Sequence, residues 1–151
     1  MRNGTTRSCG CLYKEAVGKS TRLELGMISY RYLEHIYKTG AKKRGYSYEL
    51  TMNELKLITC QKCYYCGSSP RPFNKFFRTD KSRVASFYTI SDEWADKQWI
   101  LVNGIDRVEN SIGYVIDNVV SCCKTCNDMK GTLSLSEFKS QIKNIFNNHC
   151  L

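Results

Sequence analysis

The chain has 151 residues, of which 42% are hydrophobic and 12% aromatic; this suits one domain with its own core and excludes a chain that is disordered by composition. No stretch approaches the roughly 20 apolar residues that span a bilayer, and the N-terminus lacks the apolar run of a signal peptide. We therefore expect a cytoplasmic protein with no membrane contact. The net charge of +9 favours a polyanionic partner.

The positive charge is concentrated in the first two thirds of the sequence. Residues 1–50 hold ten lysines and arginines against four acids, residues 51–100 hold eight against five, and residues 101–151 hold five against five. A basic region ahead of a neutral one indicates a nucleic-acid-binding region joined to a separate active site. A basic surface that is merely solvated is the alternative.

The N-terminal part begins with an irregular arm, residues 1–26. Apolar residues at helical spacing then predict a basic helical region that starts with a helix over 27–44. This helix should stop at Gly45, after the cations of 42-KKR-44, which are favourable at a helix C-terminus. The apolar stripe consists of Ile28, Tyr32, Leu33, Ile36 and Tyr37.

A short strand over 46–50 and a second helix follow. Thr51 and Glu54 form a T-x-x-E capping box, which predicts a helix over 51–58. Residues 68–98 are polar and basic, contain both prolines and show no strong period, so we expect an insertion or long loop there.

The last third predicts two strands and two helices. The runs 99–108 and 115–120 are apolar and β-branched enough for strands, with 109–114 as the turn between them. A short helix should begin around Cys123. Ser134 and Glu137 form another capping box ahead of a closing amphipathic helix. The stripe of that helix consists of Phe138, Ile142, Ile145 and Phe146.

Nine cysteines, an odd number, argue against the fully paired disulfide scaffold of a secreted protein. Two Cys-x-x-Cys pairs instead supply the four thiolates of a closed tetrahedral zinc site. Gly67 fits the turn after the second sulfur, where a residue without Cβ is favoured. Cys60 and Cys122 are alternative ligands, but keeping the two-residue spacing makes Cys122 a core residue. The predicted zinc ligands are Cys63, Cys66, Cys123 and Cys126.

Two oxygen donors flank the expected second strand. With zinc at one end, the two strands and the short helix form a small ββα unit, with Asp106 at the end of the first strand and Asn127 at the start of the helix. Such hard donors suit Mg²⁺, which commonly takes one or two protein ligands plus phosphate. Alternatively, Asp106 caps a turn and Asn127 caps the helix. Composition and spacing leave both interpretations open.

The motifs resemble the HNH endonucleases of the ββα-metal superfamily, especially phage-type members, over residues 60–138. The matching segments are CxYCG, NGIDRVxNxxGY and DNVVxCCxxCNxxK, with a weaker echo over 37–51. The resemblance implies an α+β fold with a small zinc-stabilised ββα-metal core, an N-terminal basic helical region and a C-terminal amphipathic helix. The corresponding division is an arm over 1–26, the basic region over 27–59 and a nuclease domain over 60–151 with an insertion at 68–98.

The resemblance also implies roles for single residues. Asp106 matches the acid that binds the catalytic cation, Mg²⁺ or Mn²⁺, and Asn118 matches the central Asn that braces the loop between strand and helix. Asn127 occupies the last motif position, where endonuclease VII-like members carry an Asn that ligates the metal. The four cysteines match the family's structural zinc site.

Arg107 stands where the family usually carries the His that activates water. A guanidinium stays protonated and cannot serve as an ordinary base, but it can grip a phosphate or stabilise charge in the transition state. The histidines, His35 and His149, lie outside the motif. The base would then be a metal-bound hydroxide, bulk water or a tyrosine, with Tyr46 and Tyr114 as candidates.

The expected partner is double-stranded DNA. The basic helix end, with Lys42, Lys43 and Arg44, would contact backbone phosphates without reading sequence, and a solvated charge cluster is the alternative. Lys130, one turn after Asn127, could reach another phosphate.

The sequence therefore predicts a metal-dependent DNA endonuclease that hydrolyses phosphodiester bonds, with homing, mobile-element and restriction-like activities all open. Asp106 and Asn127 would hold Mg²⁺ at the scissile phosphate, and Arg107 would bind the same phosphate. One site cuts one strand, so double-strand cleavage would need two copies and makes a homodimer plausible. The rival is a catalytically inactive zinc-stabilised DNA-binding module, which has no need for both oxygen ligands.

The first residues carry a further resemblance. The segment 3-NGTTRSCGCL-12 is similar to the tail of a cysteine-rich module that precedes HNH domains in some phage proteins. Cys9 and Cys11 would then be a remnant of that module. Pairing with Cys150 and His149 across the chain is the alternative.

Overall fold

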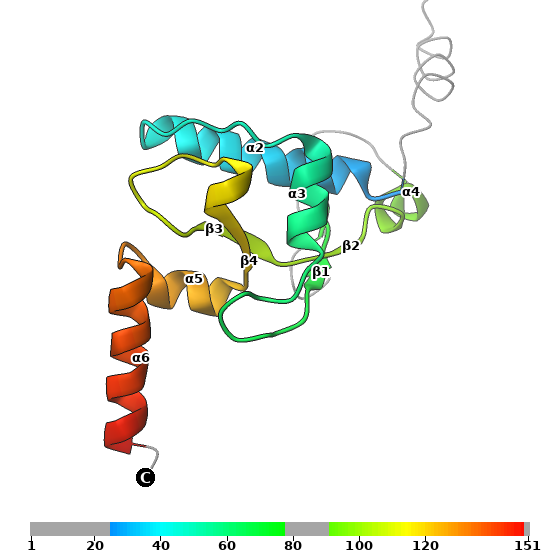
Figure 1. The fold of residues 1–151 in the computed structure, drawn as a ribbon. Helices are drawn as coiled ribbons and strands as arrows, with labels where there is room; N and C mark the ends of the chain where they lie inside the picture. Colours follow the sequence, from blue (N-terminus) through cyan, green and yellow to red (C-terminus); the bar gives the residue numbers. More distant parts are fainter. Residues whose placement is uncertain (1–24, 78–90, 150–151) are drawn as a thin grey trace, which may run out of the picture.

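The computed structural model describes residues 25–77 and 91–149. The predictions for Cys9, Cys11 and Cys150 lie outside these residues, as do most of the 1–26 arm and part of the 68–98 insertion. Within the described ranges, two small antiparallel sheets lie among helices, which confirms the α+β class (Figure 1). The division into an arm, a basic region and a nuclease domain stays a prediction.

The first long helix, α2 (Met27–Lys43), has the predicted length and ends as expected. Arg44 is its C-cap, and Gly45 follows with φ of 75°, a left-handed conformation that suits glycine. Its buried face differs from the predicted stripe, because Tyr32 and Ile36 are exposed. The residues that α2 buries are Ser29, Leu33 and Ala41.

The second helix, α3 (Met52–Thr59), begins at the predicted capping box. Thr51 Oγ1 accepts from Glu54 N at 3.3 Å, and the Glu54 carboxylate accepts from Thr51 N at 2.7 Å. The strand predicted over 46–50 is wrong in extent, since only an isolated parallel bridge joins Tyr48 to Tyr114. A strand needs backbone hydrogen bonds to a neighbouring strand along its length, and this segment pairs with the chain only at Tyr48.

Part of the expected loop at 68–98 is ordered as a strand. The strand β1 (Arg71–Phe73) pairs antiparallel with β2 (Ile100–Val102), and α4 (Asp92–Asp96) precedes β2. The single strand predicted over 99–108 is divided at Asn103. The buried Asn103 side chain donates to the carbonyls of residues 61 and 68, at 2.9 and 3.2 Å, which ties the break to the cysteine knuckle.

The second sheet belongs to the predicted ββα unit. The strand β3 (Gly104–Arg107) pairs antiparallel with β4 (Val119–Cys122), so that Asp106 lies opposite Val120. The strand β4 begins later than predicted because Ile116–Asn118 forms a single 3₁₀ turn, η1. The helix α5 (Lys124–Lys130) follows, with Cys123 as its N-cap.

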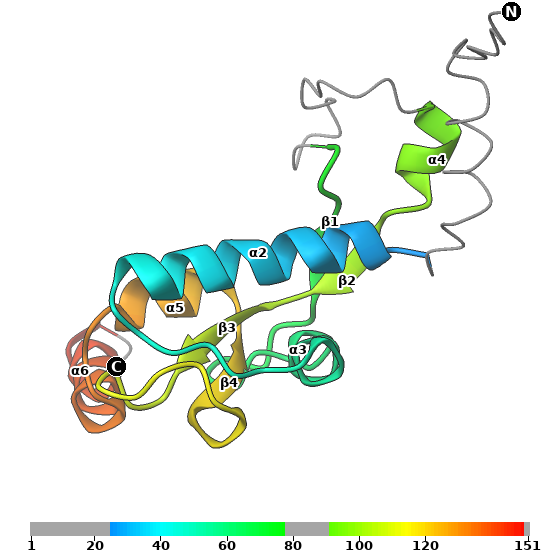
Figure 2. The same ribbon diagram turned by 90° about the horizontal axis from the view of Figure 1, so that it is seen from above.

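The core joins α2 and α3 to the β3–β4 hairpin, and it does not extend along the last helix. That helix, α6 (Leu135–His149), starts at the predicted Ser134–Glu137 box. Phe138 is buried, whereas Ile142, Ile145 and Phe146 are exposed, and α6 projects from the rest of the fold (Figures 1 and 2). None of the described helices combines the length and apolar character needed to cross a membrane. The main core consists of Ala41, Leu50, Leu55, Ile58, Ile105, Tyr114 and Val119.

Candidate active site

The four predicted zinc ligands form one cluster. The sulfurs of Cys63, Cys66, Cys123 and Cys126 all lie within 4.8 Å of one another. The Cys66 and Cys123 sulfurs are 3.7 Å apart, close to the roughly 3.8 Å between ligands of a tetrahedral zinc site with Zn–S bonds of about 2.3 Å. The donor set and its spacing therefore fit a structural zinc.

Local backbone geometry presents these sulfurs. Gly67 has φ of 72° and donates to the Cys63 carbonyl at 2.8 Å, which closes the knuckle as the sequence predicted. The Ser68 hydroxyl lies 3.3 Å from Cys66 Sγ, and hydrogen bonding to it is the main reason that the pKa of the Cys66 thiol falls to about 6. Burial raises the pKa of the Cys126 thiol in the same cluster, so the placement of the four sulfurs, and not a shared lowering of pKa, supports the zinc site.

The two alternative cysteines lie outside the cluster. Cys60 is exposed, and its thiol donates to the Leu57 carbonyl at 3.2 Å. Cys122 is 1% exposed, and burial raises its pKa. The prediction that Cys122 is a core residue is confirmed.

Asp106 lies on β3 with its carboxylate almost buried, at 7% exposure. Its Oδ2 accepts from the Tyr65 hydroxyl at 2.7 Å and lies 3.2 Å from Lys130 Nζ. Burial, followed by the hydrogen bond to Asp106, raises the pKa of Tyr65. Within the described ranges, both polar contacts of the carboxylate are made by Oδ2, and no donor bonds to Oδ1.

Lys130 faces inward, which differs from the phosphate contact expected for it. Its side chain is 1% exposed, and besides the Asp106 contact its ammonium donates to the Arg107 carbonyl at 3.0 Å. A buried ammonium needs such partners, because an unpaired charge in the interior is costly. Asn127 is exposed on α5 one turn earlier, on the same helix face.

The Arg107 guanidinium contacts two carbonyls and two aromatic rings. Its Nη1 donates to the carbonyls of Asn110 at 2.7 Å and Ile112 at 3.0 Å. The guanidinium stacks 3.7 Å above the centre of the Tyr46 ring and lies 5.4 Å from that of Tyr114. Among the described residues, no acceptor meets its Nε or Nη2.

Asn118 braces the loop that follows β3. Its Nδ2 donates to the carbonyls of Glu109 and Gly113, each at 3.0 Å, and its Oδ1 accepts from Glu109 N at 2.8 Å. The side chain is buried, so these bonds satisfy it fully. The same loop supplies the carbonyls that hold Arg107.

The basic end of α2 reaches this part of the molecule. Lys42, Lys43 and Arg44 are exposed, and Arg44 Nη2 donates to the Tyr114 hydroxyl at 2.8 Å. Tyr114 is buried beside Arg107, so the two arginines flank one aromatic ring.

Sequence reasoning did not assign a role to Tyr65. The residue lies between the two knuckle cysteines, in the CxYCG segment, and that position was the available signal. The histidines, His35 and His149, are exposed on α2 and α6.

No family model matches the chain. Over 102 residues the chain is 31% identical to the uncharacterized protein R423 of Acanthamoeba polyphaga mimivirus; the match covers 68% of this chain and 14% of the viral protein, so the chain spans about one seventh of that relative's length. Among solved structures, it is similar to the rare-cutting HNH restriction endonuclease PacI, with 20% identity and a TM-score of 0.48, over 79% of this chain and 78% of that one.

Proposed function

We propose that the chain is a metal-dependent endonuclease that hydrolyses phosphodiester bonds of double-stranded DNA. The proposal depends mainly on the Asp106 carboxylate, which lies in a ββα unit beside the four-cysteine cluster. One of its oxygens is held by Tyr65 and Lys130, and the other is available to a ligand. Asp106 and Asn127 would hold Mg²⁺ or Mn²⁺, which supplies charge stabilisation at the scissile phosphate when bound.

Tyr65 and Lys130 act as positioning residues for the carboxylate. Both contact Oδ2, and both are themselves fixed: the Tyr65 ring packs edge-on against Phe138 at 5.4 Å, and Lys130 is buried. The Lys130 ammonium also offsets part of the Asp106 charge. We therefore expect the protein alone to bind the cation weakly and DNA phosphate to complete the site.

Arg107 would grip the scissile phosphate. Its Nη1 bonds and its stacking on Tyr46 fix the guanidinium plane, while Nε and Nη2 stay available on one edge. A fixed guanidinium can donate two parallel hydrogen bonds to phosphate oxygens without further ordering. It would stabilise the charge that develops as water attacks.

The proton of the attacking water needs an acceptor other than Arg107. Stacking against Arg107 supports Tyr46 over Tyr114, whose hydroxyl accepts from Arg44 and whose ring is buried; only the phenolate form of Tyr46 could take the proton. Tyr46→Phe keeps the stacked ring and removes the hydroxyl. If Tyr46 takes the proton, this variant loses cleavage at unchanged stability; if bulk water takes it, cleavage continues.

Plasmid cleavage tests the proposal. Supercoiled DNA is incubated with the zinc-loaded protein, with and without Mg²⁺ or Mn²⁺, beside Asp106→Asn and the matched control Asp117→Asn, an exposed acid on η1. The metal-free reaction omits the cation without a strong chelator, which would strip the zinc. We expect cation-dependent nicking or linearisation that Asp106→Asn abolishes and Asp117→Asn retains. If one binding event converts supercoiled plasmid directly into linear DNA, this would support two cooperating copies of the site.

The rival function is a zinc-stabilised DNA-binding module without catalysis. The observation in its favour is the structural use of Arg107, whose Nη1 bonds stabilise the 110–112 loop. Zinc-loaded protein that binds DNA with full affinity and cuts none under any cation would select this reading.

A further inference from the structure

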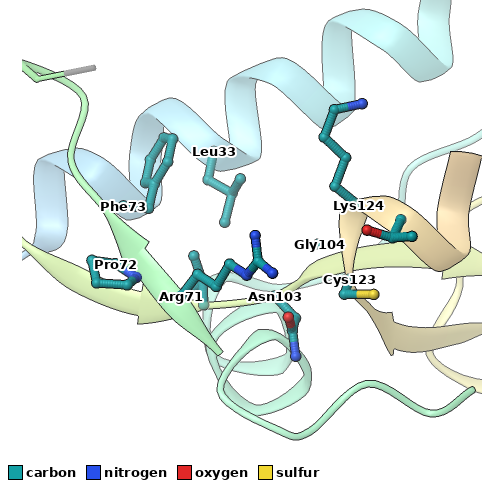
Figure 3. Close-up of a pocket in the computed structure, with 10 residues that line it drawn as sticks. Leu33, Arg71, Pro72, Phe73, Asn103, Gly104, Cys123 and Lys124 are labelled. Atoms are coloured by element: carbon teal, nitrogen blue, oxygen red, sulfur yellow. The ribbon is translucent and has the colours of Figure 1, made fainter. Parts of the chain in front are cut away.

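A cavity of about 200 Å³ lies between α2, the two-stranded β1–β2 sheet and the first turn of α5 (Figure 3). Sites that enclose a whole small molecule usually measure about 300–1,000 Å³, so this one suits part of a larger ligand. The cavity borders the cysteine cluster at Cys123, and Asp106 is not among its lining residues. Its lining consists of Leu33, Arg71, Pro72, Phe73, Val102, Asn103, Gly104, Cys123, Lys124 and Thr125.

The lining combines an apolar wall with two cations. The Arg71 side chain extends into the space beside Leu33 and Asn103 (Figure 3). Arg71 is exposed, and its guanidinium has no partner among the described residues. Lys124 pairs with Asp128 one turn along α5, but both side chains are exposed, and such a pair contributes little. Lys124 can therefore exchange this partner for another anion.

Three elements lead from the cavity toward Asp106. One helical turn covers about 5 Å, and two residues of strand cover about 7 Å, so the cavity lies on the order of one nucleotide from the carboxylate. The Tyr37 hydroxyl accepts from Ile105 N at 2.9 Å, so Tyr37 lies beside β3, next to the position of Asp106. The steps are Leu33 to Tyr37 on α2 and Gly104 to Asp106 on β3; on α5 the residue that contacts Asp106 is Lys130, six positions after Lys124.

We propose that this cavity binds the nucleotide next to the scissile phosphate, with the phosphate of that nucleotide on Arg71 and Lys124. The sugar would lie against Leu33, Phe73 and Val102. Proteins that hold single strands combine a cationic groove with an apolar or aromatic wall, and the same combination suits the sugar–phosphate backbone of one strand of a duplex. The position beside the scissile phosphate rests on the proposed function, whereas the binding of a nucleotide does not. The β1–β2 sheet, which carries Arg71, is then part of the DNA-binding surface.

The direct test compares two arginines. Binding of a short DNA duplex by the full zinc-loaded chain is measured without divalent cation over a range of salt, for the wild type, Arg71→Ala and Arg31→Ala. Arg31 is exposed on α2, two positions from Leu33 and therefore about 200° around the helix. We expect Arg71→Ala to weaken binding by about 5- to 30-fold and to reduce the salt slope by about one. Arg31→Ala should change affinity by less than about 2-fold.

A second measurement locates the contact. Single phosphates of the duplex are replaced one at a time by neutral methylphosphonates. One position should weaken binding by the wild type and have no effect on Arg71→Ala, while Arg71→Lys should keep part of the effect because it keeps the charge. Unchanged zinc content and melting temperature show that each variant is folded. Equal losses in Arg71→Ala and Arg31→Ala, or none in either, would overturn the proposal.

The outcomes separate this inference from the nuclease. If the wild type cuts DNA and Arg71→Ala binds and cuts equally well, only the assignment of the cavity is wrong. A wild type whose binding depends on Arg71, but which cuts nothing, removes the nuclease and leaves a nucleotide site. A wild type that binds no DNA overturns both.

Discussion

Two neighbouring residues on β3 depend on different parts of the molecule. Asp106 is held by Tyr65 from the cysteine knuckle and by Lys130 from α5. Arg107 is held by Tyr46, in the segment after α2, and by carbonyls of the loop that follows β3. Side chains alternate across a strand, so adjacency in the motif does not mean a shared environment. The acid should therefore depend on zinc far more than the arginine does.

Removing a zinc ligand should have the largest effect and would test this difference directly. In Cys126→Ser we expect loss of zinc and unfolding of the knuckle and α5, because structural zinc contributes on the order of 10 kcal/mol in small domains. Zinc content and amide hydrogen exchange check this. Protection should vanish over 63–68 and 124–130 and persist over α2. Cys60→Ser, outside the cluster, should keep its zinc. Retention of zinc by Cys126→Ser would contradict the four-cysteine site.

Breaking the ion pair between Asp106 and Lys130 should have the second-largest effect. Asp106→Ala leaves the Lys130 ammonium buried without its partner, so we expect a loss of about 3–5 kcal/mol in the free energy of unfolding, together with all cleavage. Urea denaturation measures the loss. The double variant Asp106→Leu, Lys130→Met should recover most of the stability and none of the cleavage. A single variant as stable as the wild type would show that the pair is not structural.

Arg107→Lys should have the third-largest effect and tests the Arg107 side of the comparison. Lysine keeps the charge but loses the two Nη1 bonds and the stacking on Tyr46, so we expect about 2 kcal/mol of destabilisation. Cleavage should fall by about 100- to 1,000-fold, as for other groups that stabilise transition-state charge. Zinc content should stay at the wild-type level. Full cleavage in this variant would exclude a bidentate grip on the phosphate.

Tyr65→Phe should have the smallest effect. It removes one hydrogen bond to Asp106 and keeps the ring against Phe138, so we expect about 1 kcal/mol of lost stability and cleavage reduced a few-fold. Thermal unfolding and initial cleavage rates measure both. Tyr64→Phe is the matched control, because the Tyr64 side chain is more than half exposed. Equal effects in both variants would argue against a positioning role for Tyr65.

Local signals predicted much of the fold. The capping boxes at Thr51 and Ser134, the stop at Gly45 and the paired cysteines all depend on residues close in sequence, and the structure confirms them. The buried face of α2, the β1–β2 pairing and the late start of β4 depend on distant partners, which spacing does not specify. Tyr65 and Asp106 are 41 positions apart, so their hydrogen bond was beyond local patterns.

Lys130 illustrates the same limit in the site. A lysine one turn after Asn127 looks from sequence like a phosphate contact, because long cationic side chains usually reach solvent. Here the ammonium has a carboxylate and a carbonyl close enough to keep it inside. Which side of a short helix is buried depends on what packs against it, and composition does not contain that information.

The cysteine cluster has a consequence for how such a chain can change over time. Cys66 and Cys123 are 57 positions apart, yet their sulfurs lie 3.7 Å from each other. A zinc ion bound by these cysteines would fix both ends of the intervening chain. Doubling the length of a flexible loop then costs only about 0.6 kcal/mol of loop-closure free energy. Residues added in the connection between β1 and β2 would leave β3, β4 and α5 in place, so new binding surface can be acquired there without rebuilding the proposed site.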